Sequence, residues 1–122
     1  PRINAAGRMG DAKRSVAMLL ADTTAEAVEK AGVVDKTNQE RRGFDTSITK
    51  EALEMIEQDD LLRAARTTVL FKQDWHKGVV GIVASRCLDK YCRPTIILTE
   101  SNGKATGSAR SVAGFDVHQA IE

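Results

Sequence analysis

The segment that decides the fold is DWHKGVVGIVASR, residues 74–86. It follows a β-type run, TTVLF at residues 67–71, and passes through a polar turn that holds Trp75 and His76. It then enters a run with helical periodicity that starts near Gly78. A β-type run, a turn containing glycine and a helical pattern together predict a strand–turn–helix unit.

The predicted helix, residues 78–91, has two different faces. On a helical wheel the apolar residues share one side, which we expect to face the core: Val80, Val83, Ala84, Cys87, Leu88 and Tyr91. The opposite side carries Gly78, Ile82, Ser85, Arg86 and Asp89. Glycines at 78 and 81 each weaken a helix by about 1 kcal/mol relative to Ala, so we expect another part of the chain to approach the helix backbone closely. Two interpretations remain open for this face: tight helix–sheet packing with a solvated Arg86, or a binding site at the helix N-terminus.

The composition does not by itself indicate a nucleic-acid-binding protein. Among the 122 residues, 18 Lys+Arg nearly balance 17 Asp+Glu, which gives a net charge of +1. A polyanion therefore meets no global electrostatic attraction. Basic residues do gather locally, as at Arg41-Arg42, and such patches bind phosphate only where the geometry supports it. The length fits one modest domain or pieces of two.

Cysteine usage and hydropathy indicate the cellular setting. Cys87 and Cys92 lie in one helical pattern at a spacing that suits neither a disulfide nor a zinc site, which favours a reducing, cytoplasmic compartment. No apolar run approaches the ~18 residues of a membrane span, and no signal-peptide pattern occurs, so no membrane partner is expected. The chain starts at Pro1 and stops as a helical pattern begins after Phe115. We expect an internal fragment of a longer protein.

Residues 1–10, PRINAAGRMG, predict a compact, turn-rich segment with small residues beside Arg8. An arginine held among small residues can contact an anion, and an ordinary loop that leads into a helix is the alternative. Asp11 is expected to cap a helix over residues 12–21. Its apolar residues Val16, Leu19 and Leu20 predict self-association of the chain through exposed helix faces.

Residues 24–58 predict one long helix of roughly 35 residues, which would span about 50 Å. Apolar residues recur at spacings of three and four on both sides of a polar middle, residues 38–45, and Thr23 or Thr24 supplies the cap. Because polar residues occupy the apolar phase of the middle, we expect burial only at the two ends, as in a rod that joins two modules. A break at Gly43, which would give a helical hairpin, is the alternative.

Three β-type runs predict a short sheet in the second half of the chain, at residues 67–71, 95–99 and 105–112. Pro94 ends the preceding helix, and the apolar run after it suits a central strand. Asn102-Gly103 predicts a tight type I′ hairpin turn, and Asp116 is expected to cap a short last helix. The predicted fold class is α/β: a long linking α-helix followed by a small α/β domain with a short mixed sheet.

The main candidate for chemistry is TGSARS, residues 106–111. Gly107 bares backbone N–H groups, Ser108 supplies a hydroxyl, and Arg110 supplies a planar guanidinium that suits a phosphate. Side chains two positions apart on a strand share a face, so Ser108 and Arg110 should lie together. A solvent-exposed strand of ordinary polarity is the alternative. His76 and His118 lie too far apart in the sequence to define a metal pair, and no nucleophile–base arrangement is visible.

Five motifs occur in a fixed order along the chain: PRINAAGR at 1–8, Asn38 with Arg41, WHKGVVGIVASR at 75–86, Arg93-Pro94, and GSARS at 107–111. Together they resemble the RecJ-type single-strand-specific 5′-to-3′ DNA exonucleases, members of the DHH phosphoesterase superfamily. The resemblance covers essentially the whole chain. Gly32 and Gly43 depart from the pattern, because glycines are unusual inside a linking helix.

The resemblance implies a division into residues 1–22, the tail of a DHH catalytic domain, 23–60, the interdomain helix, and 61–122, the first part of the DHH-associated domain. In the family, the Asp and His residues that bind two Mn²⁺ or Mg²⁺ ions lie upstream of the first motif. We therefore expect this chain alone to bind no metal and to have no catalytic residue. The residues expected to hold the phosphates of single-stranded DNA are Arg8, His76, Arg86, Gly107, Ser108 and Arg110. The implied role is DNA repair and recombination.

Two other functions remain open. One is a phosphodiesterase of the same superfamily that acts on short oligonucleotides or cyclic dinucleotides. The other is a non-catalytic single-strand-binding module. Such modules stack bases on aromatic side chains, whereas Phe71, Tyr91 and Phe115 are expected in the core here.

Overall fold

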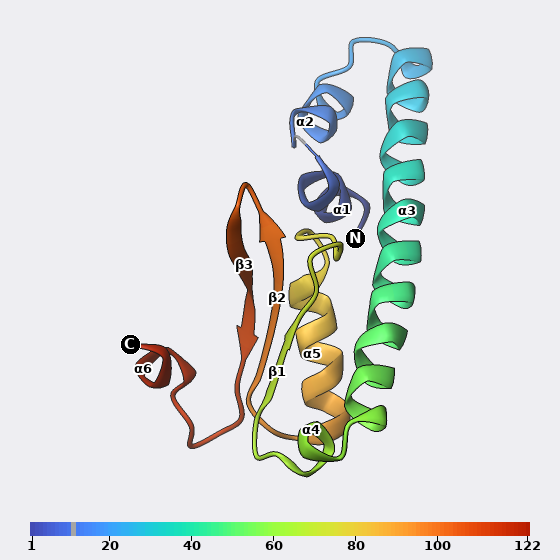
Figure 1. Cartoon of the computed structure of the whole chain (residues 1–122). Coiled ribbons are helices and arrows are strands. Elements are labelled where there is room, and N and C mark those ends of the chain that lie inside the picture. Colours follow the sequence, from blue (N-terminus) through green and yellow to red (C-terminus); the bar gives the residue numbers. More distant parts are fainter. Residues whose placement is uncertain (11) are drawn as a thin grey trace. The chain divides into compact units, whose positions relative to one another are not determined.

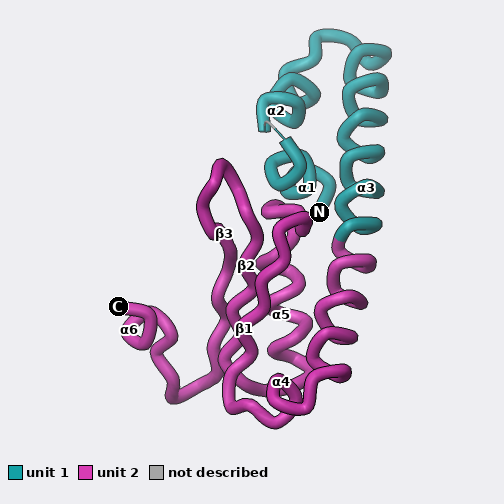
Figure 2. Tube along the Cα trace, in the orientation of Figure 1, with its two compact units in different colours: residues 1–44 teal, residues 45–122 magenta. Residues whose placement is uncertain are grey.

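The computed structural model describes residues 1–10 and 12–122 of the chain. The chain forms two compact units, Pro1–Phe44 and Asp45–Glu122, which Figure 2 distinguishes by colour. Helix α3, Thr24–Gln58, contributes its first part to one unit and its second part to the other.

The first unit contains α1 (Arg2–Met9), α2 (Lys13–Leu19) and the beginning of α3. The turn-rich segment predicted for residues 1–10 is wrong, because these residues form a helix. Alanine is the best helix former, and Ala5 and Ala6 are buried, so helix propensity and packing agree here. Asp11, the predicted cap, lies outside the described residues. The apolar side chains of Val16, Leu19 and Leu20 are exposed, and the self-association inferred from them stays a prediction.

Helix α3 is continuous through Gly43, so the long helix is confirmed and the hairpin alternative is wrong. Thr23 caps its N-terminus, since the Thr23 hydroxyl accepts a hydrogen bond from the Glu26 backbone N–H at 3.1 Å. A Cβ added at Gly43 would meet no atom within 4 Å, so the cost of this glycine is limited to helix propensity. This cost, about 1 kcal/mol, is too small to break a helix that is packed elsewhere along its length.

The expectation of burial only at the helix ends is wrong for two residues of the polar middle of α3, whereas residues 39, 40 and 42–44 are exposed. Asn38 is 4% exposed and Asp45 is 2% exposed. Polar groups are buried where they find hydrogen-bond partners. The Asn38 side-chain oxygen accepts from Arg41 Nη2 at 3.3 Å, and the Asp45 carboxylate accepts from Thr49 Oγ1 at 3.3 Å.

The second unit is built on a three-stranded mixed sheet of β1 (Thr68–Phe71), β2 (Thr95–Ser101) and β3 (Lys104–Arg110), as Figure 1 shows. β2 is central, parallel to β1 and antiparallel to β3. The parallel pair requires a crossover, which α5 (Val80–Tyr91) provides. Two short helices, α4 (Asp60–Ala64) and α6 (Val117–Ile121), flank the sheet segments in the sequence. The predicted α/β architecture with a short mixed sheet is confirmed.

The turns and caps of the second unit follow the sequence. Asn102 has a φ of 52° and Gly103 a φ of 72°, as a type I′ hairpin requires. The Asp116 side chain accepts from the Gln119 N–H at 3.0 Å and so caps α6. Asp59 caps α4 in the same way, with 2.9 Å to the Leu61 N–H.

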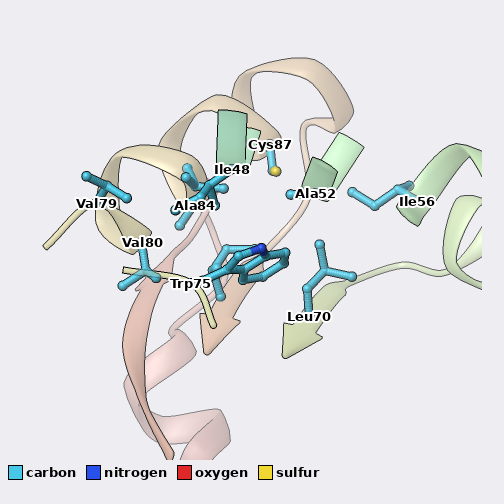
Figure 3. Close-up of a cluster of buried hydrophobic side chains, with 11 residues drawn as sticks. Ile48, Ala52, Ile56, Leu70, Trp75, Val79, Val80, Ala84 and Cys87 are labelled. Atoms are coloured by element: carbon cyan, nitrogen blue, oxygen red, sulfur yellow. The ribbon is translucent and has the colours of Figure 1, made fainter. Parts of the chain in front are cut away.

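One hydrophobic core joins α5, the second part of α3 and one face of the sheet (Figure 3). Its members are Ile48, Ala52, Ile56, Leu70, Trp75, Val79, Val80, Val83, Ala84, Cys87 and Ile97. The face predicted from the helical wheel of α5 is the buried face: its first four residues, from Val80 to Cys87, are buried, and Leu88 and Tyr91 are half-buried. Burial raises the pKa of the Cys87 thiol, which is typical of an inert core cysteine.

The predicted core position of two aromatic residues is wrong. Phe71 is 52% exposed and Phe115 is 43% exposed, while Tyr91 is half-buried against the core. Side chains alternate along a strand, and β1 buries Thr68 and Leu70 on one face. Phe71 must therefore point to the other face, so its apolar character alone did not place it in the core.

The Arg93 side chain links the end of α4 to strand β1 through hydrogen bonds. Its guanidinium donates to the backbone carbonyls of Leu62 (2.7 Å), Arg63 (3.0 Å) and Ala65, and its Nε donates to Thr68 Oγ1 at 2.8 Å. It thereby satisfies carbonyl groups that the end of α4 leaves without helical partners.

Replacement of this arginine is therefore expected to destabilise the second unit. Arg93→Ala should lower the free energy of unfolding by about 2–4 kcal/mol, because hydrogen bonds to a charged donor contribute about 1.5–3 kcal/mol and several are lost together. Arg93→Lys should recover only part of this, since an ammonium group cannot reach several carbonyls in one plane. Urea unfolding followed by Trp75 fluorescence measures both; equal stability of Arg93→Ala and wild type would contradict the assignment.

In the part of the chain that the structure describes, no helix combines the length and the apolar character that a membrane span needs.

Candidate nucleic-acid interface

Two residues of β3 point together toward α5. Arg110 Nη1 donates a hydrogen bond to Ser108 Oγ at 2.8 Å, so the predicted shared strand face is confirmed. Arg110 Nη1 also donates to the backbone carbonyl of Ala109 at 2.9 Å. These contacts hold one edge of the guanidinium against its own strand.

Helix α5 supplies the other side of this cluster. Arg110 Nε donates to Ser85 Oγ at 3.3 Å, and the Ser85 hydroxyl in turn donates to the Gly81 carbonyl at 3.1 Å. A methyl group added at Gly81 would lie 3.2 Å from Arg110 Nη2 and 3.3 Å from Ser108 Oγ. The close approach expected from the glycines of this helix therefore occurs at Gly81. We call Gly81, Ser85, Ser108 and Arg110 the α5–β3 cluster.

The α5–β3 cluster presents a positive charge whose partners are neutral. Arg110 is exposed, and among the described residues it has hydroxyl and carbonyl partners and no carboxylate. A guanidinium that no carboxylate neutralises, beside hydroxyl donors, can bind a phosphate bidentately. Ser85 belongs to the helix face noted in the sequence but was not among the predicted site residues. The signal for it was its i,i+4 spacing from Gly81, which places both on one side of the helix.

Gly107 has a packing role in the structure. A Cβ at this position would lie 2.0 Å from the carbonyl oxygen of Ile97 and 2.8 Å from Leu98 Cδ2. Gly107 pairs with Leu98 in the ladder between β3 and β2. Only a residue without a side chain allows the two strands to approach this closely. Its expected phosphate contact through the backbone stays a prediction.

Arg86 has a carboxylate partner that the sequence did not indicate. Its Nη2 lies 2.9 Å from Asp45 Oδ2, and the two side chains are 53% and 3% exposed. The pair joins α5 to α3 across a long sequence separation, which no local pattern reports. The alternative of a merely solvated Arg86 is therefore wrong, and its phosphate contact is still a prediction.

His76 lies in the turn that precedes α5, and it is half-buried. Its Nδ1 accepts a hydrogen bond from the Gly78 N–H at 2.9 Å, so a neutral ring carries its proton on Nε2. The turn is anchored by Thr99, whose hydroxyl donates to the Trp75 carbonyl at 2.7 Å, and by Trp75 Nε1, which donates to Glu51 at 3.0 Å. The ring therefore sits on a fixed backbone.

Arg8 belongs to the first unit, where it is exposed in the last turn of α1. The five other predicted site residues belong to the second unit. Of these, the structure brings Ser108 and Arg110 into direct contact, and it places Gly107 on the same strand. No group of three His, Cys, Asp or Glu side chains able to hold a metal ion occurs among the residues described here.

The second half of the chain matches a known protein domain. Residues 64–122 match the family model for the DHHA1 domain. This segment runs from the end of α4 to α6 and contains the whole mixed sheet and the α5–β3 cluster.

Similarity extends over nearly the entire chain to proteins named single-stranded-DNA-specific exonuclease RecJ. The chain is 42% identical to the protein of Bacillus subtilis over 99% of its own length, and 38% identical to that of Escherichia coli over 100%. It covers 15% and 22% of these two relatives, so it spans about one fifth of their length or less.

Solved structures agree with this. A crystal structure of Thermus thermophilus RecJ in complex with Mg²⁺ matches with a TM-score of 0.84 at 34% identity, over 99% of this chain and 18% of that one. A structure of exonuclease RecJ bound to manganese matches with a TM-score of 0.82 at 34% identity, over 99% and 29%. Over nearly its whole length the chain is therefore similar to one part of the RecJ proteins, and its residues 64–122 match the DHHA1 domain.

Proposed function

We propose that this chain is part of a longer single-stranded-DNA-specific 5′-to-3′ exonuclease, and that it binds the phosphates of the DNA. The observation that carries the proposal is the α5–β3 cluster within the DHHA1 segment, where the Arg110 guanidinium lies beside two hydroxyl groups and has no carboxylate partner among the described residues. Arg110 and Ser108 would donate to a phosphate oxygen, and Ser85 and Gly81 would hold the guanidinium in place. His76, Arg86 and Gly107 would contact the strand nearby, and Arg8 would do so from the first unit.

Hydrolysis is assigned to the remainder of the longer enzyme. The RecJ structures named above contain Mg²⁺ or Mn²⁺, and we extend the use of such an ion to the whole exonuclease. The described residues of this chain do not offer a cluster that fits a divalent ion, so no metal ligand is assigned to it. We place residues 1–22 at the end of the catalytic domain, 23–60 in the linking helix and 61–122 in the DHHA1 domain. The proposed setting is DNA repair and recombination in the cytoplasm.

A degradation assay tests this function. The full-length protein should shorten a long 5′-phosphorylated single strand in the presence of Mn²⁺ and leave a duplex of the same sequence intact. The 122-residue chain alone should leave both intact, because the metal ligands of the resembled family precede its first motif. Metal-dependent shortening by the repurified chain would contradict this division of labour.

The same assay separates the two alternatives. A phosphodiesterase for short substrates would cleave dinucleotides or cyclic dinucleotides faster than the long strand. A single-strand-binding module would bind the long strand and cleave neither substrate in its full-length form.

A further inference from the structure

A buried carboxylate contacts Arg86, one of the residues proposed to bind phosphate. The side chain of Asp45 is 3% exposed, and both of its oxygens have partners: Oδ1 accepts from Thr49 Oγ1 at 3.3 Å, and Oδ2 pairs with Arg86 Nη2 at 2.9 Å. Burying a carboxylate is costly unless it is paired and hydrogen-bonded. A carboxylate with both oxygens engaged has a defined orientation, which it passes on to its arginine partner.

The Arg86 guanidinium is engaged by Asp45 through one nitrogen, and its side chain is partly exposed. The Asp45 contact uses Nη2, and about half of the side chain remains accessible. Arg86 directly follows Ser85, which contacts Arg110. Consecutive helical residues differ by about 100° around the axis. Arg86 and Arg110 therefore flank the same turn of α5 from two sides.

We propose that Asp45 is a positioning residue for nucleic-acid binding, which acts by fixing the Arg86 guanidinium so that its remaining donors face a phosphate beside α5. The inference rests on the proposed function. A long arginine side chain that is already ordered loses less conformational freedom when it binds, so fixing it favours the complex.

If Asp45 acted only through its charge, its removal would change the affinity for DNA in the opposite direction. A carboxylate near a phosphate repels it, so removal of this charge should strengthen binding to DNA if Asp45 merely neutralises Arg86. If Asp45 positions Arg86, removal of the carboxylate should weaken binding although the protein becomes more positive. The sign of the change therefore distinguishes the two roles.

The test uses Asp45→Asn in the full-length protein, with the affinity for a 5′-phosphorylated single strand measured by fluorescence anisotropy at fixed salt. Asparagine has nearly the same shape, but it is uncharged and has one acceptor oxygen, so it cannot present an oxygen to both Thr49 and Arg86. We expect affinity to fall about three- to tenfold, in line with the entropy of one long side chain. Unchanged or tighter binding would overturn the proposal.

A second variant avoids a change of charge at a buried site. Thr49→Val removes the hydroxyl that orients Asp45 and keeps the volume and every charge. It should lower affinity about twofold, since the carboxylate keeps its arginine but loses the hydrogen bond from the Thr49 hydroxyl. Unchanged affinity of a folded Thr49→Val variant would overturn the proposal even where Asp45→Asn fails to fold.

Two controls separate failure of this inference from failure of the proposed function. Asp60→Asn removes the same charge from an exposed pair with Arg63 and reports the effect of charge alone. Arg110→Ala measures how much the α5–β3 cluster contributes to the affinity for DNA. If Arg110→Ala keeps full affinity, the proposed function fails and this inference with it. If Arg110→Ala binds weakly while Asp45→Asn matches Asp60→Asn or binds more tightly, only the role of Asp45 is refuted.

Discussion

Gly107→Ala is expected to destabilise the second unit by about 3 kcal/mol or more, at the upper end of the range for overpacking a well-packed site. The new methyl carbon would lie 2.0 Å from the Ile97 carbonyl oxygen and 2.9 Å from the Ile97 carbonyl carbon. Both are backbone atoms of the central strand β2, so no side-chain rotation relieves the clash. β2 and β3 must separate at this point, which also displaces Ser108 and Arg110.

A matched substitution gives the control. Gly43→Ala is the same chemical change on the exposed face of α3, where nothing lies within 4 Å of the added carbon. It should stabilise the chain by about 0.5–1 kcal/mol, because alanine is the better helix former. Urea unfolding of both variants, followed by Trp75 fluorescence for the second unit and by circular dichroism for the helices, provides the comparison. A Gly107→Ala variant as stable as wild type would refute the close strand approach.

Arg110→Ala is expected to cost about 1.5–3 kcal/mol in binding to single-stranded DNA, the range of a charge-assisted hydrogen bond. This corresponds to roughly a ten- to hundredfold loss of affinity. The free energy of unfolding should barely change, because the arginine is exposed and its partners, Ser85 and Ser108, are half-exposed hydroxyls that water can satisfy. In the full-length protein, this variant should therefore lose affinity for single-stranded DNA while its free energy of unfolding stays close to that of wild type.

Arg110→Lys tests the geometry of this grip. Lysine keeps the charge but not the planar fork, so it should recover only part of the lost affinity. Full recovery would mean that position 110 contributes only charge to the interface.

The sequence predicted the second unit well because its signals are local. Pro94, Asn102-Gly103 and Asp116 each act within a few residues, and the wheel of α5 assigns Val83 and Cys87 to the core without any long-range information. The contact between Ser108 and Arg110 followed from strand periodicity alone.

The misses at Asp45 and Gly107 concern tertiary contacts, whereas the helix within residues 1–10 was missed although its signal is local. The Asp45–Arg86 pair joins two helices, and Asp45 looked solvated because its burial depends on a partner far away in the sequence. Phe71 looked like a core residue, yet strand alternation turns it away from α5. Gly107 looked like an open backbone donor, and its contact with Ile97 became visible only once the strand register was known.

The salt dependence of single-strand affinity tests the central claim, a specific phosphate grip at Arg110, most directly. Arg63→Ala is the matched control, because it removes the same charge from the same unit, where Arg63 is already paired with Asp60 at 2.6 Å. A lost phosphate contact lowers the slope of log K against log[salt] by about 0.7 for a single strand. We predict this decrease for Arg110→Ala and a slope close to wild type for Arg63→Ala. Equal losses of slope and affinity in the two variants would show that Arg110 belongs to a diffuse positive surface and would contradict the account.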